Sequence, residues 1–293
     1  MSEGNSVINF GDLSKPAAVL IEKISNAIGM LYQPTQIKRV ARAEVEADKI
    51  KALGDVEATE IQQRAISRLI HEEGKKQENI ESITSQATER LDDSAKPENV
   101  EDDWISHFFE KCRNVSDKDM QGLWSNLLAG EANKPGSYSK RTVELIATLD
   151  KSEAHLFTKL CGFSISGGDI FPLILDQKDD IYLKSDITFS TLNHLESIGL
   201  IKLNNLQNFV LQNLPKKVTL MCFGIPINFV LPSETNNNLD IGSVMLTQAG
   251  QQLAPICGAR LNPEFLNYMI EHYKKKGIQA SIIHPNQQHH RTP

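Results

Sequence analysis

Side chains that could do chemistry are spread along this sequence without the spacing of a known catalytic motif. Zinc hydrolases carry an HExxH segment, many nucleophilic hydrolases place Ser at a sharp strand-to-helix turn, and nucleotide hydrolases carry GxxxxGK[ST]. None of these patterns occurs here. The histidines before the C-terminal segment lie far apart in the sequence, at His71, His107, His155, His194 and His272. We therefore expect no catalytic residue.

Metal and cofactor sites are not predicted either. The four cysteines contain no CxxC pair, which argues against a zinc site or a disulfide framework and favours reduced, buried thiols. Three histidines gather near the C-terminus, at 284, 289 and 290, where a polar tail explains them without a metal. The charged residues Asp102, Asp103, Glu131 and Arg141 could converge in one site, but helix caps and exposed ion pairs are the favoured interpretation.

Length and composition limit the classes of protein to which this chain can belong. A chain of 293 residues is long enough for two domains. Its formal net charge of −6 gives no general attraction to nucleic acid or anionic lipid. The polar start, Ser2 to Asn5, predicts no signal peptide, and no apolar run is long enough to span a bilayer. We therefore expect a cytoplasmic protein.

The elements that must position any site are organised around a helical hairpin over residues 119–149. Large apolar residues recur on one face of its first helix, including Trp124 and Leu128. Pro135-Gly136 predicts the end of this helix, and Ser139 can cap the second one. The hairpin should pack other helices against its apolar faces.

An amphipathic helix is predicted over residues 13–32, near the N-terminus. Its apolar stripe consists of Leu20, Ile21, Ile24, Ile28 and Leu31. Either this stripe packs on the protein or on a partner subunit, or it inserts into a membrane surface, which would make the protein peripheral to the inner membrane. The polar face lacks the Lys/Arg-rich character that favours anionic lipid, so packing is the preferred interpretation.

Residues 37–91 predict a long helical arm. The segment contains no proline and is rich in Ala, Glu, Lys, Gln and Arg, and residues 41–65 resemble the Ala-Glu repeats of stomatin- and flotillin-type coiled coils. A thin stripe of large apolar residues runs along it, at Ile50, Leu53, Ile61, Ile66, Leu69 and Ile70. Such a stripe stabilises a long helix only against other helices, so we expect self-association; a solvated single helix is the alternative.

The last third of the chain alternates helix and strand signals. We expect a loop over 162–169, strands over 171–175 and 181–183, and a final helix over 261–276. The segments LESIGLI (195–201) and LTQAG (246–250) resemble the winged-helix ending of many bacterial regulators. This resemblance implies a winged-helix-like fold, but nucleic-acid binding is not expected, because residues 188–197 contain no Lys or Arg.

The predicted fold is therefore mostly α, in the α+β class. Its expected parts are an N-terminal amphipathic helix (1–36), a long helical arm (37–91), a helical domain with the central hairpin (92–162), a winged-helix-like α+β domain (163–276) and a flexible tail (277–293).

The hairpin also carries a family resemblance. The segment 123–157 and the opening at 13–34 resemble an uncharacterised bacterial domain-of-unknown-function family, which is distantly similar to the abortive-infection alpha proteins. The candidate motif or interface residues are Trp124, Asn126, Leu128, Glu131, Ser139, Arg141 and Thr142, with Ala129 and Glu153 beside them. The resemblance implies bacterial defence against phage and supplies no catalytic residue.

Together these observations predict a non-enzymatic protein that forms homo-oligomers, contacts a phage or host protein, and needs no cofactor. Two alternatives stay open. One is a membrane-active effector that uses residues 13–32, and the other is a winged-helix regulator that binds nucleic acid.

Overall fold

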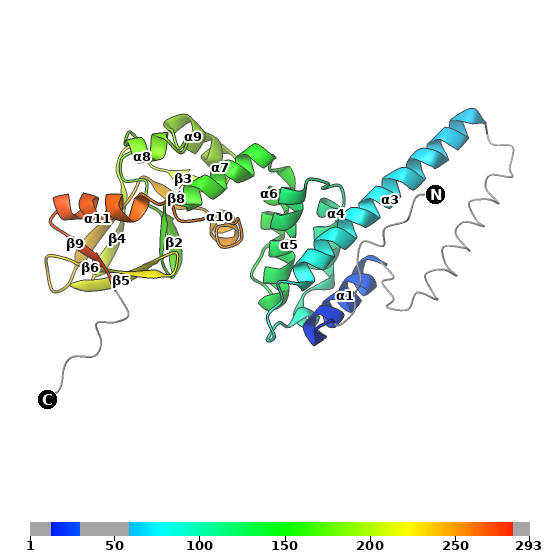
Figure 1. The fold of residues 1–293 in the computed structure, drawn as a ribbon, viewed down its shortest axis with the longest axis horizontal. Helices are drawn as coiled ribbons and strands as arrows, with labels where there is room; N and C mark the ends of the chain where they lie inside the picture. Colours follow the sequence, from blue (N-terminus) through cyan, green and yellow to red (C-terminus); the bar gives the residue numbers. More distant parts are fainter. Residues whose placement is uncertain (1–12, 30–58, 284–293) are drawn as a thin grey trace. The chain divides into compact units, whose positions relative to one another are not determined.

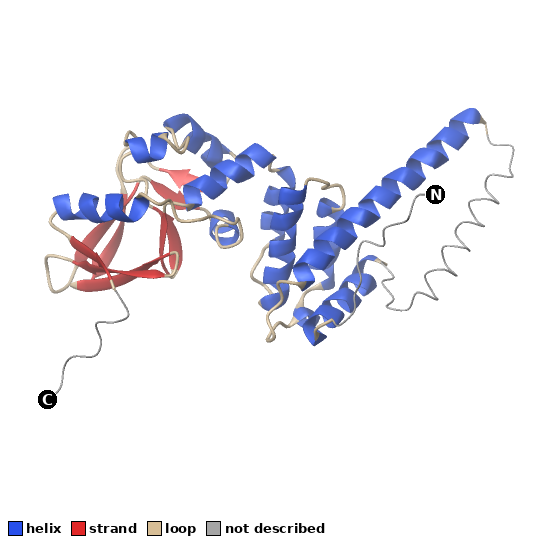
Figure 2. Ribbon diagram, in the orientation of Figure 1, coloured by secondary structure: helices blue, strands red, loops and turns tan. Residues whose placement is uncertain are grey.

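A computed structural model describes residues 13–29 and 59–283 of the chain. The chain divides into two compact units, at Ala147 and Thr148. The described residues of the first unit form helices, whereas the second unit combines helices with antiparallel sheets (Figures 1 and 2). This architecture confirms the predicted α+β class. Leu31 and the first part of the predicted arm, residues 37–58, lie outside the described residues.

The first unit is a helical bundle. Its helices are α1 (Lys15–Ile28), α3 (Glu60–Thr88), the 3-10 turn η1 (Pro97–Asn99), α4 (Asp102–Cys112), α5 (Lys118–Asn133) and α6 (Lys140–Thr148). The C-terminal half of α3 packs on α5 through Ile80 and Ile83, and α1 packs on α4 and η1. The N-terminal half of α3 extends beyond the other helices of this unit (Figure 1).

The central hairpin is confirmed. Helix α5 ends at Asn133, before Pro135-Gly136, and the hydroxyl of Ser139 accepts a hydrogen bond from the N–H of Thr142 at 3.2 Å in the first turn of α6. Helix α3 begins with a capping box of Thr59 and Gln62 and continues without a break through Gly74.

The segment 92–99, predicted to separate two domains, joins α3 to α4 inside the first unit. The backbone N–H of Asp92 donates to the side chain of Asn133, and that of Lys96 donates to the carbonyl of Ala132. The division between the units falls at the end of α6, between Ala147 and Thr148.

The second unit follows a mixed order. Its elements are α7 (Lys151–Cys161), β1 (Ser164–Gly167), β2 (Asp169–Pro172), α8 (Asp180–Leu183), α9 (Phe189–Ser197), β3 (Ile201–Leu203), β4 (Phe209–Leu214), β5 (Lys217–Cys222), β6 (Ile225–Val230), β7 (Asn237–Gly242), β8 (Val244–Leu246), α10 (Gln248–Leu253), α11 (Phe265–Lys275) and β9 (Gln279–Ile282). A five-stranded antiparallel sheet has the order β2-β1-β5-β6-β9, and two further pairs are β3-β8 and β4-β7.

Aromatic side chains fill the core of the second unit. Phe163 contacts the rings of Tyr182 and Phe265, and Tyr273 on α11 packs edge-on against Phe229 of β6, with ring centroids 5.2 Å apart. Helix α11 is thereby held against the five-stranded sheet.

Three local predictions were wrong. Residues 181–183 belong to the short helix α8, because the buried hydroxyl of Tyr182 donates to the carbonyl of Leu173 and draws this turn inward. Residues 164–167, predicted as a loop, form β1 and pair with both β2 and β5. Residues 279–282, predicted as flexible tail, form β9 at the edge of β6.

The structure contains the helix and strand elements that resemble a winged helix, with a longer insertion between β3 and β8. Helix α9 leads into β3, β3 pairs with β8, and β8 leads into α10. Between β3 and β8 the chain inserts four strands, β4 to β7, instead of a single wing hairpin.

Candidate protein-interaction site

The most specific motif residues build the core of the helical unit. Trp124 and Leu128 are fully buried, and the Trp124 ring packs edge-on against Phe108 of α4, with ring centroids 5.2 Å apart. Within the described part of the chain, the buried indole N–H of Trp124 has no acceptor. These residues therefore hold α5 against α4 and present no surface to a ligand.

Glu131 closes the loop between the two helices of the hairpin. Its buried carboxylate accepts hydrogen bonds from the backbone N–H groups of Gly136 at 2.6 Å and Tyr138 at 2.9 Å. Burial raises the pKa of Glu131, while the backbone donors of this loop oppose the shift. Trp104 contributes from the other side, because its indole N–H donates to the carbonyl of Tyr138 at 2.8 Å.

The remaining motif residues also have structural roles or lie at the surface. Thr142 is buried at the start of α6, Asn126 and Ser139 are half-buried, and Arg141 is exposed. In the second unit, the carboxylate of Glu153 accepts from the backbone N–H of Asp150 at 2.8 Å, and its other oxygen lies 2.7 Å from His194 Nε2. The charged residues Asp102, Asp103, Glu131 and Arg141 do not form one cluster; Asp102 pairs with Lys23 of α1 at 2.6 Å.

The apolar stripe of α1 is used inside the helical unit. Leu20, Ile21 and Ile24 are buried, and Ile28 is half-buried. The hydroxyl of Ser106 on α4 donates to the carbonyl of Ala27 and adds a polar contact to this interface. Membrane insertion would require this helix to leave the face that it covers.

The two winged-helix segments contact each other through backbone groups. The hydroxyl of Thr247 donates to the carbonyl of Gly199 at 2.7 Å and accepts from the N–H of Gly250 at 3.1 Å. A Cβ at Gly250 would lie 2.2 Å from the carbonyl oxygen of Leu200, so only glycine fits this close approach. The pattern that resembles bacterial regulators is thus explained by packing, independently of DNA.

A groove in the second unit is lined by none of the predicted motif residues. It has a volume of about 600 Å³ and lies between the β2–α8 connection, the start of α9 and the β3–β4 loop. Three large apolar side chains at its rim are exposed, at Leu183, Phe189 and Leu206, the last with 96% of its surface accessible. Five amide side chains line it, at Gln177, Asn204, Asn205, Gln207 and Asn208.

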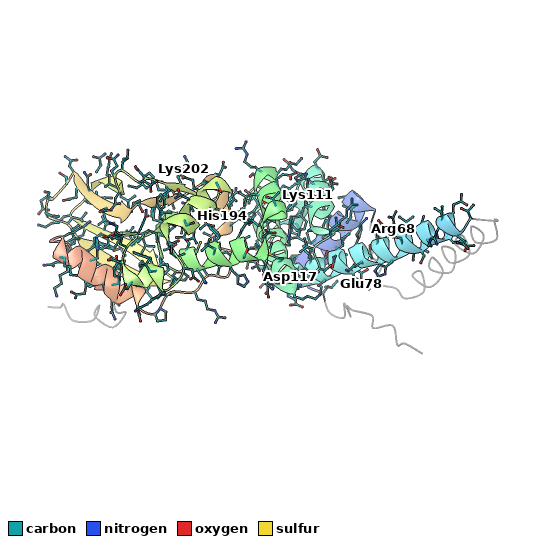
Figure 3. The ribbon with its side chains drawn as sticks, turned by 90° about the horizontal axis from the view of Figure 1, so that it is seen from above. Arg68, Glu78, Lys111, Asp117, His194 and Lys202 are labelled. Carbon is teal, nitrogen blue, oxygen red and sulfur yellow. The ribbon has the colours of Figure 1, made fainter. Side chains whose placement is uncertain are left out.

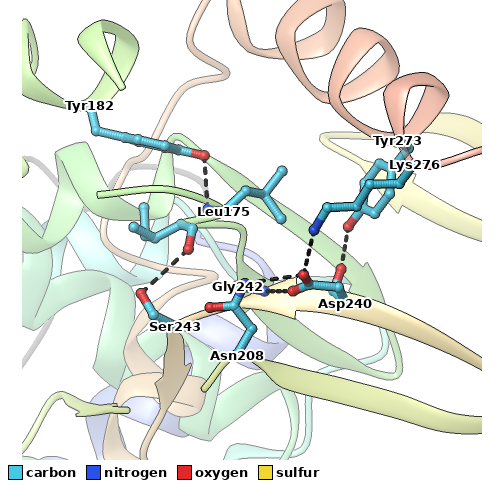
Figure 4. A network of polar contacts seen from close by, with 9 residues as sticks. Leu175, Tyr182, Asn208, Asp240, Gly242, Ser243, Tyr273 and Lys276 are labelled. Carbon is cyan, nitrogen blue, oxygen red and sulfur yellow. Dashed lines mark hydrogen bonds and ion pairs between the residues drawn. The ribbon is translucent and has the colours of Figure 1, made fainter. Parts of the chain in front are cut away.

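Hydrogen bonds hold the polar lining of this groove in place. The amide of Gln177 donates to the hydroxyl of Ser243 at 3.0 Å, and the backbone N–H of Asn204 donates to the carbonyl of Ser243 at 2.9 Å. Figure 4 shows the network beneath, in which Asn208 donates to the carboxylate of Asp240 at 3.1 Å. These hydrogen bonds fix the positions of the residues that form the polar wall of the groove.

Asp240 is the centre of that network. Its carboxylate receives hydrogen bonds from Lys276 Nζ at 2.7 Å, from Asn208, and from the backbone N–H of Gly242 at 2.8 Å, and its carbonyl accepts from the hydroxyl of Tyr273 at 2.6 Å (Figure 4). Burial alone would raise the pKa of Asp240, but these donors outweigh it and hold the pKa below its ordinary value. The network anchors β7 to α11 and gives no general base.

The chemistry of the groove is that of binding. Asp176 and Lys178 are the only charged residues along it, and their charges cancel, so phosphate groups find little attraction. The hydroxyl of Ser243 is buried and lacks a neighbouring base. No group of His, Cys, Asp or Glu side chains that could hold a metal occurs among the described residues.

The free amides favour a polypeptide ligand. Within residues 59–283, the side chains of Asn205 and Gln207 have no hydrogen-bond partner, so both can donate and accept. A peptide backbone offers alternating donors and acceptors, and apolar side chains of the peptide could contact Leu183, Phe189 and Leu206. Sequence analysis missed this groove because its residues come from three loops that are separate in sequence.

A second exposed apolar surface lies on the projecting half of α3. Ile61, Leu69 and Ile70 are 71, 57 and 47% exposed. Beside them, Arg64 pairs with Glu60 at 3.8 Å and Arg68 with Glu72 at 3.5 Å; Arg68 is labelled on this helix in Figure 3. Within the described residues, the stripe predicted for the arm is therefore exposed at these three positions.

The fold and the surfaces define the chain as an α+β protein in which a helical unit precedes a mixed unit with an open groove. Comparison with protein families matches residues 63–270 to the family described as "Protein of unknown function (DUF2806)", and the chain belongs to this family. Neither the curated proteins nor the solved structures gave a match. None of the helices in the described ranges combines the length and apolar character needed to cross a membrane.

Proposed function

We propose that this protein is a non-enzymatic, oligomerising protein that acts through protein contacts. The observation that carries the proposal is the projecting half of α3, which leaves the bundle with three large apolar side chains exposed. Exposing such a surface in water is unfavourable, and burying it against a second helix stabilises both.

A second copy of the same helix is the proposed partner. Ile61, Ala65 and Leu69 follow each other at intervals of four residues, and Ile66 and Ile70 form an adjacent row. The charged residues beside these rows follow the order Glu60, Arg64, Arg68, Glu72, and each Arg pairs with a Glu of its own helix. A second copy can therefore meet the apolar rows without leaving these charges unpaired.

Light scattering of the full chain tests this proposal. The triple variant Ile61→Gln, Leu69→Gln, Ile70→Gln should lower the measured mass to that of one chain, without loss of stability, because these residues are exposed. The matched control is Ser67→Gln with His71→Gln, two exposed residues on the opposite side of α3, which should retain the wild-type mass. A wild-type chain that is monomeric at every concentration would refute the proposal.

The groove of the second unit supports a separate contact, with an extended peptide segment of another protein. Its amide lining and exposed apolar rim match a peptide in both polar and apolar groups, whereas the nearly neutral lining does not match nucleic acid. A bound peptide whose apolar side chains contact the rim would bury Phe189 and Leu206, which are 55 and 96% exposed.

Peptide display against the full chain tests the groove. Selected peptides should lose about tenfold or more in affinity against Phe189→Ser with Leu206→Ser, since two apolar contacts each contribute about 1 kcal/mol or more. Val210→Ser, an exposed apolar residue of β4 outside the groove, is the control. Equal binding by both variants would place the contact elsewhere.

The biological setting that we propose is defence of a bacterium against phage, in the cytoplasm. Its support is the resemblance of residues 123–157 to an uncharacterised family that is distantly similar to the abortive-infection alpha proteins. Plaque counts on cells that express the wild-type chain should fall relative to cells without it, and the α3 triple variant should restore them. Equal counts in all three strains, across a phage panel, would remove this proposal.

A further inference from the structure

Several edge strands of the second unit are protected against pairing with a further strand. At β2, the side-chain oxygen of Gln251 accepts from the N–H of Ile170 at 2.9 Å, and the side-chain amide donates to the carbonyl of the same residue at 2.8 Å. At β3, which is short, the carboxylate of Glu196 accepts from the N–H of Leu203 at 2.8 Å. Strand β4 pairs irregularly with β7, and its Asn213 has a φ of +56°. Short strands, bulges and covered backbone groups are the usual means of preventing contacts between sheet edges.

Strand β9 shows none of these protections within residues 59–283. It lies beside β6 and forms the other edge of the five-stranded sheet (Figure 1). Its sequence, QASI, contains no charged residue and no proline. Its pairing with β6 is continuous from Gln279 to Ile282, without a bulge. The edge is therefore regular, uncharged and open to a further strand.

The backbone groups along this edge belong to Ala280 and Ile282. The N–H of Ile283 donates to the carbonyl of Pro226 at 2.9 Å, so the backbone groups at positions 283, 281 and 279 face β6. Because this direction alternates along an antiparallel ladder, the N–H and carbonyl groups of Ala280 and Ile282 face away from β6.

The side chains of β9 alternate between the two faces of the sheet. Ala280 is paired with Phe229, which is buried against Tyr273 of α11, so Ala280 and Ile282 lie on the face that α11 covers. Ser281 lies on the opposite face and is exposed.

We infer that the β9 edge is a contact between two copies of this chain, in which the two β9 strands pair antiparallel about a two-fold axis at Ser281. The contact is separate from the one proposed for α3 and does not depend on it.

The strand is complementary to its own copy in this arrangement. Ala280 faces Ile282 of the partner subunit, so the outward N–H of each residue meets the outward carbonyl of the other. A small side chain thereby lies beside a large one. The two Ser281 side chains face each other in a pair that is not hydrogen-bonded through the backbone, where side chains approach most closely and hydroxyl groups can bond across the strands. No like charges meet within the paired strands.

The contact should be weak. A pair of strands this short buries much less than the roughly 1,600 Å² that is typical of a stable interface. We therefore expect a dissociation constant on the order of 1 mM, so that the contact is absent in the micromolar range and forms at high protein concentration.

Sedimentation equilibrium of the full chain tests the contact. The starting protein carries Ile61→Gln, Leu69→Gln and Ile70→Gln, so association through α3 does not contribute. Its mass should be that of one chain at about 10 µM and should rise towards that of two chains near about 1 mM. Adding Ser281→Lys places like charges opposite each other and should weaken the pairing about tenfold or more. Ser281 is exposed, so this change should leave the fold intact.

Two further proteins separate pairing at β9 from a general effect of charge. Thr219→Lys makes the same change at an exposed position of β5, an inner strand of the same sheet, and should leave the association unchanged. Mixing the Ser281→Lys chain with a Ser281→Glu chain should restore pairing, because opposite charges then face each other.

Three results would overturn the inference. The first is a starting protein that keeps the mass of one chain up to about 1 mM, which would leave the edge to an extended segment of another protein. The second is a Ser281→Lys chain that associates as strongly as the Thr219→Lys chain. The third is a mass that rises past two chains without limit, which would indicate aggregation. Each result is independent of whether the wild-type chain associates through α3.

Discussion

The carboxylate of Glu131 lies 2.6 Å from the backbone nitrogen of Gly136, five residues further along the chain. Its second oxygen accepts from Tyr138, so one side chain holds both ends of the turn that joins α5 to α6. A buried carboxylate that accepts backbone N–H groups replaces the water that those groups would otherwise bind. Glu131 thus has a structural role in the loop, whereas the sequence favoured a helix cap or an exposed ion pair.

Replacing Glu131 should destabilise the helical unit. Glu131→Gln keeps the size but turns an NH₂ group towards a backbone donor, which leaves a buried N–H without an acceptor and costs about 1–3 kcal/mol. Urea unfolding, followed by the fluorescence of the two tryptophans of this unit, measures the change. Glu78→Gln, an exposed residue of α3, is the control, and equal midpoints for the two variants would contradict the proposed role.

Gly242 and Gly168 provide a matched pair for the second unit. Both have positive φ, +86° and +104°, but a Cβ at Gly242 would lie 2.4 Å from the carbonyl oxygen of Ile174, whereas a Cβ at Gly168 meets no atom within 4 Å. Gly168→Ala should cost about 1–2 kcal/mol, from backbone strain alone. Gly242→Ala should cost about 3 kcal/mol or more, because the backbone clash adds to the strain. Thermal unfolding of both variants checks the order, and a smaller loss at Gly242 would show that β7 can move away from Ile174.

The elements that the sequence predicted well depend on local patterns. The hairpin α5–α6 follows from apolar spacing, Pro135-Gly136 and a Ser cap, all within about thirty residues that need no partner to be recognised. The same holds for α9 with β3, and for β8 with α10, whose cap is Thr247.

The features that sequence analysis missed depend on contacts between distant segments. Strand β1 is short, and it pairs with β2, its neighbour in sequence, and also with β5, more than fifty residues later. The groove combines residues near 177, 189 and 205, which are distant in sequence. Sequence spacing does not predict such contacts between distant segments, because loop residues show no periodic pattern.

Asp240 and Lys276 should contribute unequally to the stability of the folded chain, although they form one ion pair. The Lys276 side chain is 44% exposed, so its pairing in water contributes about 1 kcal/mol or less, and Lys276→Met should change stability little. Asp240→Ala removes in addition the acceptor for Gly242 and Asn208, and should cost about 1–3 kcal/mol. Urea unfolding at pH 7 distinguishes them, and equal losses would mean that the ion pair, rather than the backbone contact, dominates.

The pH dependence of Asp240 has a defined sign. Because its pKa is lower in the folded chain than in the unfolded one, its stabilising contribution is present above an unfolded pKa of about 4 and is lost as the pH falls through the lower, folded value. The free energy of unfolding of the second unit should therefore fall on acidification below about pH 4, and less so in Asp240→Asn. If the free energy of unfolding falls equally with pH in the wild-type chain and in Asp240→Asn, this contribution is excluded.

His272 should add a second pH dependence, at a higher pH. It lies on α11 between Tyr268 and Tyr273, and burial is the main cause that lowers its pKa. Lys276 lowers it further, while Asp240 and Asp179 oppose the shift. The folded chain therefore holds His272 neutral at a pH where the unfolded chain binds a proton. Stability should fall as the pH drops below the unfolded value of about 6.5 and continue to fall until the folded group also protonates. Urea midpoints between neutral and mildly acidic pH measure this slope. His272→Phe removes the titrating group, keeps an aromatic ring beside Tyr273, and should flatten the curve in this window; an unchanged slope would assign it to another residue.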